Sequence, residues 1–173
     1  MNLLVFSDSH GSRREMLTAI ERQRALPLCE RPEYILFLGD GLRDFDSVED
    51  LDLPGVSLLS VKGNCDAFGA QDTPESRMPV IANYRVIMTH GHRLSVKAGL
   101  GRAVAFAAEK QADILLFGHT HNPLFKRYEK DETAYGVSLK KPLVLFNPGS
   151  VREGSFGSLK LSEKGVFASF GTI

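Results

Sequence analysis

The segment that most constrains the fold is residues 113–121, which read DILLFGHTH. Its four apolar residues, 114–117, are too few for a core helix and suit a strand that is buried on both faces. Gly118 ends this run, and His119 and His121 follow it directly. Open α/β sheets bind their ligands beyond the carboxyl ends of the strands, so this segment predicts a strand that leads into a site.

All five histidines of the chain lie close behind apolar runs: His10, His90, His92, His119 and His121. Asp8, Asp40 and Asn64 follow apolar runs as well. A single histidine in such a place would be interpreted as an ordinary loop residue, but this interpretation does not explain why all five histidines follow apolar runs. We therefore expect one edge of one sheet to collect imidazoles, carboxylates and an amide from five strands. Divalent transition metals prefer this donor set.

The other apolar patterns predict a single α/β domain over residues 1–173, with a mixed sheet as its core and helices outside. Further strands are expected at 3–6, 34–38, 56–61, 84–89, 124–128 and 143–146, followed by a hairpin over 159–170. Ser12 and Glu15 have capping-box spacing and predict a helix to about residue 23. The first two strands and this helix then form a right-handed βαβ unit with parallel strands.

The remaining segments are less regular. Ser95 is expected to cap a helix that ends near residue 111. Its buried face would carry Val96, Leu100, Val104 and either Ala107 or Ala108. A short helix can form within 44–54, residues 67–79 are predicted to be surface loop, and 129–141 is a polar excursion between two strands.

The charge balance points to a small substrate. The chain has 21 basic and 21 acidic residues and is 43% hydrophobic, as is usual for a soluble globular protein. A long nucleic-acid footprint would need a clustered basic face, which this sequence lacks. The acidic residues Asp44, Asp46, Glu49 and Asp50 and the basic residues Lys126, Arg127, Lys130, Lys140 and Lys141 are interpreted as solvated loops.

The two cysteines, Cys29 and Cys65, have neither disulfide-framework nor zinc-site spacing, which favours a reducing compartment. The sequence opens on a predicted strand without a basic leader, and no apolar run reaches the length of a membrane span. We therefore expect a cytoplasmic protein that does not enter the membrane. The sequence leaves open whether it forms a homo-oligomer.

Six short motifs together resemble those of one enzyme family. They are D-S-H at 8–10, G-D at 39–40, G-N-C-D at 63–66, T-H-G-H at 89–92, G-H-T-H at 118–121 and F-N-P-G-S at 146–150. In this order they resemble the calcineurin-like metallophosphoesterases, and within them the small bacterial and archaeal phosphodiesterase branch. The resemblance implies a four-layer α/β/β/α sandwich of two mixed sheets flanked by helices, with metals at the carboxyl ends of the strands.

The resemblance also implies a ligand set and a reaction. One divalent ion would be held by Asp8, His10 and His121, a second by Asn64, His90 and His119, and Asp40 would bridge the two. Mn²⁺ is the expected metal, and Ni²⁺, Fe²⁺, Zn²⁺ and Mg²⁺ are the alternatives. The implied activity is hydrolysis of a small phosphodiester by in-line attack of a metal-bridging hydroxide, with the metals about 3.5–4 Å apart.

One position departs from the family pattern. Many members have a histidine where this chain has Cys65, and that histidine is thought to steady the phosphoryl group or to protonate the leaving group. The general acid is therefore open between His92 and solvent. We predict that His92 is catalytic and contacts the substrate, and the alternative is that it only orients a neighbouring loop or ligand. Cys65 is either a packing residue or a thiol that supports the ligands.

Two other functions compete with the phosphodiesterase. A phosphomonoesterase can use the same dinuclear site, and the site residues do not distinguish the two. A non-catalytic interaction scaffold occurs among the retromer-subunit relatives of the branch, where metal ligands tend to be lost or replaced. All seven expected ligand positions carry ligand-capable side chains here, which favours catalysis.

Overall fold

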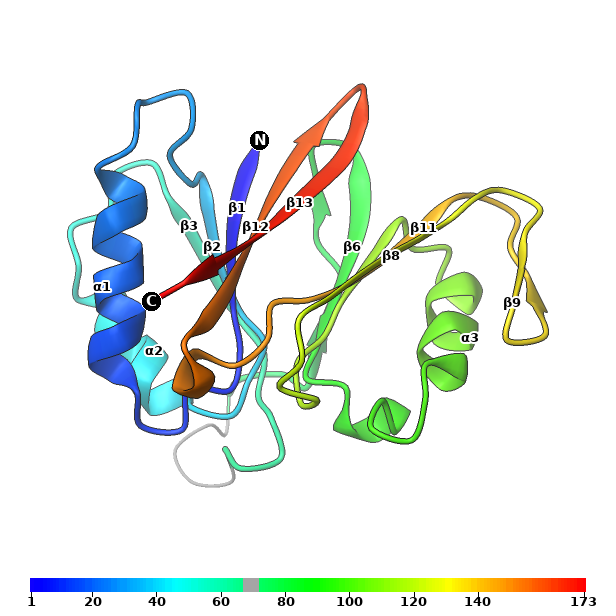
Figure 1. The fold of residues 1–173 in the computed structure, drawn as a ribbon, viewed down its shortest axis with the longest axis horizontal. Coiled ribbons are helices and arrows are strands. Elements are labelled where there is room, and N and C mark those ends of the chain that lie inside the picture. The colour runs from blue at the N-terminus through cyan, green and yellow to red at the C-terminus, as the bar shows by residue number, and fades with distance from the viewer. Residues whose placement is uncertain (67–71) are drawn as a thin grey trace.

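Two β-sheets pack face to face, and helices cover their outer faces (Figure 1). The structure, a computed structural model, describes residues 1–66 and 72–173. Helices α1 (Arg13–Arg24) and α2 (Leu42–Glu49) lie outside one sheet, and α3 (Gly101–Glu109) lies outside the other. The predicted α/β/β/α sandwich is therefore confirmed. Within the described ranges, no helix is long and apolar enough to cross a membrane.

The first sheet has the strand order β13-β12-β1-β2-β3. Its strands are β1 (Asn2–Phe6), β2 (Tyr34–Phe37), β3 (Ser57–Ser60), β12 (Ser155–Ser162) and β13 (Gly165–Thr172). Strands β1, β2 and β3 are parallel, as the βαβ pattern predicted, whereas β12 runs antiparallel to both β1 and β13. The parallel strands bring their carboxyl ends to one edge, which is the lower edge in Figure 1.

The second sheet has the order β4-β6-β7-β11-β8, with β5 paired to β6. Its strands are β4 (Ser76–Arg77), β5 (Val80–Ile81), β6 (Tyr84–Thr89), β7 (Ile114–Leu116), β8 (Leu124–Tyr128) and β11 (Leu143–Asn147). Strands β6, β7 and β11 are parallel to one another. A separate hairpin of β9 (Thr133–Ala134) and β10 (Val137–Ser138) interrupts the segment that was expected to be a polar excursion.

The central strands are buried on both faces, which explains their continuous apolar runs. In β2, Leu36 faces the second sheet, whereas Ile35 and Phe37 face the helices. In β7, Leu116 faces the first sheet and Leu115 faces the α3 side. Three apolar layers result, one between the sheets and one under each helical layer, and they hold the strand ends in fixed relative positions.

Several sequence expectations were wrong in detail. The 67–79 segment was expected to be loop, but β4 forms at its end; residues 67–71 lie outside the described part. Ser12 precedes α1 without the side-chain hydrogen bond of a capping box. The third helix begins at Gly101 and not at Ser95, because Ser95 (φ 52°) and Gly99 (φ 142°) adopt left-handed backbone that an α-helix cannot contain.

Candidate metal centre

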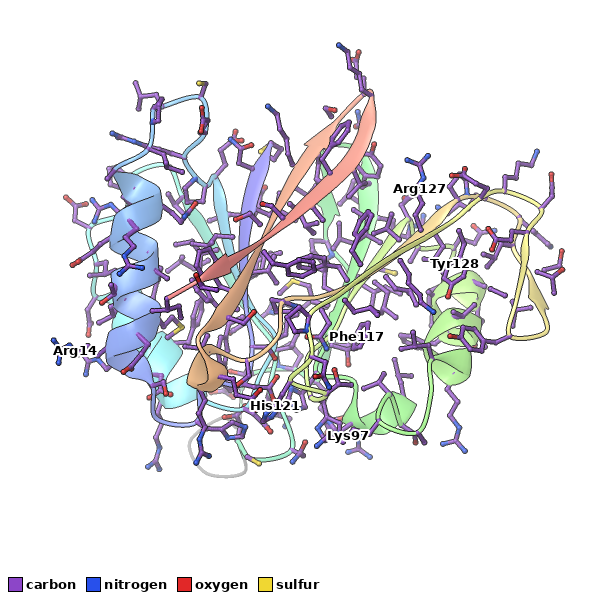
Figure 2. The ribbon with its side chains drawn as sticks, in the orientation of Figure 1. Arg14, Lys97, Phe117, His121, Arg127 and Tyr128 are labelled. Atoms are coloured by element: carbon purple, nitrogen blue, oxygen red, sulfur yellow. The ribbon has the colours of Figure 1, made fainter. Side chains whose placement is uncertain are left out.

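The proposed ligands sit at sharp backbone turns just beyond the strands. Five of them have positive φ, a conformation that is rare for residues other than glycine. They are Asp8 (54°), His10 (44°), Asp40 (61°), His119 (67°) and His121 (62°). Such strained positions cluster at functional sites, where the surrounding structure enforces them. The turns let side chains from separate strands converge at the lower end of the molecule, where Figure 2 labels His121.

Two buried carboxylates lie at the centre of this convergence. Asp8 and Asp40 both lie near the same two imidazoles. His10 Nε2 is 3.7 Å from Asp8 Oδ1 and 3.8 Å from Asp40 Oδ2. His90 Nε2 is 3.8 Å from Asp8 Oδ1 and 3.3 Å from Asp40 Oδ2. The two carboxylates and two imidazoles therefore enclose one small polar space.

Two more of the proposed ligands, His119 and His121, extend this cluster. His121 Nε2 lies 3.2 Å from Asp8 Oδ1, and the His121 ring is 5.4 Å from that of His10. The His119 ring packs edge-on against His90 at 5.0 Å. In the described residues, donor atoms within 4.8 Å of one another form three trios. Two of these trios overlap the two expected ligand sets. They are Asp8–His10–His121 and Asp40–His90–His119.

The protein holds one oxygen of each carboxylate and leaves the other facing the histidines. Asp8 Oδ2 accepts hydrogen bonds from Ser7 Oγ (2.6 Å) and from the backbone N–H of His119 (2.9 Å). Asp40 Oδ1 accepts one from the backbone N–H of Cys65 (2.7 Å). The remaining oxygens, Asp8 Oδ1 and Asp40 Oδ2, are the ones nearest the imidazole nitrogens. Their orientation is therefore set before any ligand arrives.

The donor set fits divalent cations. Asp8 Oδ1 and His90 Nε2 are buried and have no hydrogen-bond partner among the described residues. A buried polar atom without a partner is costly, so a group that satisfies both atoms would stabilise the site. His90 Nδ1 lies 2.8 Å from the carbonyl oxygen of Leu38, which can only accept a hydrogen bond. This contact puts the proton of neutral His90 on Nδ1 and leaves Nε2 free to bind a metal.

The charges in the cluster shift the pKa values of its members. Burial alone would raise the pKa of Asp40, but His90 and the Cys65 backbone outweigh burial and hold this pKa below its usual range. Burial opposes ionisation of His90 too, yet Asp40 and Asp8 raise its pKa. Burial and the neighbouring charge of His90 lower the pKa of His119 to about 4. The cluster therefore concentrates negative charge at its carboxylates and keeps His119 neutral, as a metal ligand must be.

Asn64, Cys65 and His92 lie around the cluster. Asn64 and Cys65 are exposed, and Asn64 Nδ2 donates a hydrogen bond to Cys65 Sγ at 3.2 Å. Cys65 can also form a trio with His10 and Asp40, and partial desolvation of its thiol, together with Asp40, raises the pKa of this thiol to about 11. His92 packs beside His90 and His119, with ring centroids 5.6 and 6.2 Å away. It lies next to the proposed ligands and belongs to none of the three trios.

His92 has a buried nitrogen of its own. Its Nδ1 has no hydrogen-bond partner in the described part of the chain. Burial and then the charge of His90 lower the pKa of His92. A cavity of about 360 Å³ opens beside the cluster, and its lining includes His10, Asp40 and Cys65 together with Leu42, Arg43, Asp46 and Thr73. This space can hold a small ligand that reaches the cluster.

Asp66 is a residue whose role the sequence did not reveal. Its carboxylate accepts hydrogen bonds from the backbone N–H groups of Asp40, Gly41, Leu42 and Gly63, at 2.7–3.0 Å. It thus fixes the loop after β2 against the loop after β3 and caps the start of α2. Its place in G-N-C-D, three residues after Gly63, was the available sequence clue.

Two further expectations need correction. The site was expected at one edge of one sheet, but it lies where the edges of two sheets meet. The first sheet supplies Asp8, His10, Asp40 and Asn64, and the second supplies His90, His119 and His121. Asp44 was interpreted as a solvated residue, yet it accepts hydrogen bonds from Ser9 Oγ (2.6 Å) and the Gly11 N–H (2.8 Å). It therefore holds the loop that carries His10.

Known proteins resemble this chain in sequence over most of its length. A model described as the calcineurin-like phosphoesterase superfamily domain matches residues 1–162. The probable metallophosphoesterase YsnB of Bacillus subtilis is 30% identical over 153 residues, which cover 88% of this chain and 76% of that protein. The phosphodiesterase YfcE of Escherichia coli is 27% identical over 169 residues, which cover 87% of this chain and 79% of YfcE.

A solved structure shows the same fold. A conserved protein of Streptococcus pneumoniae, described as a predicted phosphoesterase, superposes with a TM-score of 0.69 at 23% identity. The match covers 99% of this chain and 88% of the other. At this identity the likeness supports the fold alone.

We predict that Asp40→Asn weakens the binding of at least one divalent metal by about tenfold or more, equivalent to at least about 1.4 kcal/mol. The reason is that Asp40 Oδ2 faces both His10 and His90, and the substitution removes its negative charge. Calorimetric titration with Mn²⁺ and metal analysis of the purified variant measure the effect. The exposed Asp52→Asn is the matched control. Full occupancy and unchanged affinity in Asp40→Asn would rule out a bridging role.

Proposed function

The chain belongs to the calcineurin-like phosphoesterase superfamily, and we propose that it is a metal-dependent phosphodiesterase that hydrolyses a small phosphodiester. The observation that carries this proposal is the buried carboxylate–imidazole cluster, in which Asp8 Oδ1 and His90 Nε2 face inward without partners in the described structure. The relative named as a phosphodiesterase supports the choice of a diester.

In this proposal the cluster holds two divalent ions. Asp8, His10 and His121 would bind one, Asn64, His90 and His119 the other, and Asp40 both. Mn²⁺ is the expected metal. When bound, such ions supply positive charge for the phosphoryl oxygens and lower the pKa of water enough for it to act as the nucleophile near neutral pH.

The chain's own residues would then position the substrate. The cavity beside Cys65 would accept one substituent of the phosphodiester, and Arg43, which also lines this cavity, would pair with an anionic group there. We propose that His92 donates a hydrogen bond to a phosphoryl oxygen, and its position beside the rings of His90 and His119 supports this role. This scheme needs no nucleophile from the protein. Ser7 and Asp44 therefore have structural roles: Ser7 holds Asp8, and Asp44 holds the loop that carries His10.

Metal analysis and hydrolysis assays together test the function. Purified protein would be analysed for bound metal and then assayed with aryl phosphodiesters and aryl phosphomonoesters side by side, with and without a chelator. The proposal expects metal-dependent cleavage that favours the diester. Preference for the monoester would assign a phosphomonoesterase to the same site. Absence of both metal and hydrolysis would favour a non-catalytic interaction scaffold.

The other expectations concern the setting of the protein. We propose that residues 1–173 form a single domain that acts in the cytoplasm on a small substrate. The exposed thiols of Cys29 and Cys65, neither of which is in a disulfide, suit a reducing compartment. Whether the protein assembles as a homo-oligomer is measured directly by light scattering of the purified chain.

We predict that His92→Ala retains fold and metal content while kcat for the diester falls by about 10²–10⁴-fold, as is typical for the loss of a general acid or substrate hydrogen bond. The measurement combines steady-state kinetics with metal analysis of the same preparation. Normal turnover in His92→Ala would show that His92 takes no part in the reaction, and loss of one metal from this variant would show that His92 is a ligand.

We predict that Cys65→Ser keeps kcat within about tenfold of the wild type, a barrier change of about 1.4 kcal/mol. The backbone N–H of Cys65 serves Asp40 and is retained in the variant, and the serine hydroxyl can still accept the hydrogen bond from Asn64. A loss of several orders of magnitude with both metals bound would show that the thiol itself acts in the reaction.

A further inference from the structure

His121 lies between two carboxylates from distant parts of the chain. Its Nε2 is 3.2 Å from Asp8 Oδ1, and its Nδ1 is 2.9 Å from Glu153 Oε1. The first contact points into the buried cluster, whereas Glu153 lies at the rim, with 59% of its side chain exposed. The imidazole therefore connects the cluster to a glutamate that belongs to none of the three trios.

The position of Glu153 is tied to the same strand end that carries Asp8. Glu153 ends the short 3₁₀ helix η2 (Val151–Glu153), which follows the N-P-G-S turn. The N–H of Val151 donates to the carbonyl of Ser7 (3.0 Å), and that of Arg152 donates to the carbonyl of Asp8 (3.3 Å). Ser150 Oγ donates to the same Asp8 carbonyl at 2.8 Å. Asp8 and Glu153 are thus held in register on either side of His121.

This arrangement decides which nitrogen of His121 carries its proton. Both neighbours are carboxylates, which can only accept when ionised, but only the contact of Nδ1 with Glu153 is a hydrogen bond, because Asp8 Oδ1 has no hydrogen-bond partner among the described residues. Nδ1 therefore donates its hydrogen to Glu153 Oε1, and Nε2 is left to bind a metal. His90 is oriented in the same way, because its Nδ1 donates to the carbonyl oxygen of Leu38. Because Glu153 is more than half exposed, solvent screens its charge, and the directional hydrogen bond is the part that orients the ring.

We propose that Glu153 is a positioning residue: it fixes the tautomer and orientation of His121 and so strengthens binding of the metal that His121 would hold with Asp8 and His10. This inference rests on the proposed metal centre, and it does not depend on which phosphate ester the protein cleaves. Carboxylates that accept the second N–H of a metal-bound histidine fix its ring in this way and raise its basicity. Glu153 touches neither substrate nor metal in this role.

The test measures metal binding in three variants: Glu153→Ala, Glu153→Gln and Glu163→Ala. Glu163 is an exposed glutamate in the turn between β12 and β13 and serves as the matched control. Each protein, stripped of metal and then titrated with Mn²⁺ by calorimetry, yields an affinity that does not depend on any substrate. We expect Glu153→Ala to weaken the affinity for one of the two Mn²⁺ ions by about 10–100-fold. Glu153→Gln should lose less, because its amide oxygen still accepts from Nδ1.

Two further readouts separate positioning from a general structural role. The melting temperature of the metal-free protein should be the same in Glu153→Ala and Glu163→Ala, whereas the rise in melting temperature on adding Mn²⁺ should be smaller in Glu153→Ala. Imidazole nitrogen NMR of the metal-free protein should show His121 with its proton on Nδ1 in the wild type. The same signals should show mixed tautomers in Glu153→Ala.

The outcomes distinguish this inference from the proposed function. Wild-type Mn²⁺ affinity in Glu153→Ala would overturn the positioning role and leave the phosphodiesterase proposal intact. Metal binding that depends on Glu153, in a protein that cleaves neither diesters nor monoesters, would overturn the function and leave the positioning role intact. A wild-type protein that binds no Mn²⁺ would overturn both proposals, because His121 would then have no metal to bind.

Discussion

The structure depends on keeping two buried carboxylates, Asp8 and Asp40, beside each other. Like charges in a poorly solvated space destabilise the fold unless cations or hydrogen-bond donors compensate them. Here the compensation is divided: backbone and hydroxyl donors hold one oxygen of each group, and imidazoles surround the other. The same division that makes the carboxylates tolerable in the fold also leaves their free oxygens directed at the imidazoles, where divalent cations are the most effective partners.

That geometry is enforced by the loops rather than by the strands alone. Asp66 ties four backbone N–H groups of two loops together, and Asp44 anchors the loop of His10. Gly63 and Gly118 permit close approaches, since a Cβ at Gly63 would collide with Asp40 Oδ1 and one at Gly118 would collide with Ser7 Oγ. The left-handed backbone at the ligands costs free energy locally, and these ties hold it in place.

The two sheets contribute different parts of the cluster. Both carboxylates come from the first sheet, together with His10, whereas the second sheet supplies His90, His119 and His121. The apolar layer between the sheets therefore sets the distance between carboxylates and imidazoles, because it fixes how the sheets face each other. In addition, the turn after β11 returns the chain to β1 and places Glu153 against His121. The family model spans residues 1–162, which contain the second sheet and every strand of the first sheet except β13.

The sequence by itself determined which residues could form the site and where most strands lie, because buried strands such as β2 and β7 have continuous apolar runs and the candidate ligands follow them at once. It also indicated the sandwich fold through its motifs. It could not show that two sheets share the site, since contacts between sheets join residues far apart in the chain. The start of α3 was missed for a different reason: the left-handed backbone at Ser95 and Gly99 overrides a helical pattern. Only the tertiary structure assigned Asp66 and Glu153 their partners, because all but one of the hydrogen bonds described for them reach across 24 to 32 positions of sequence and depend on loop geometry that no local pattern encodes.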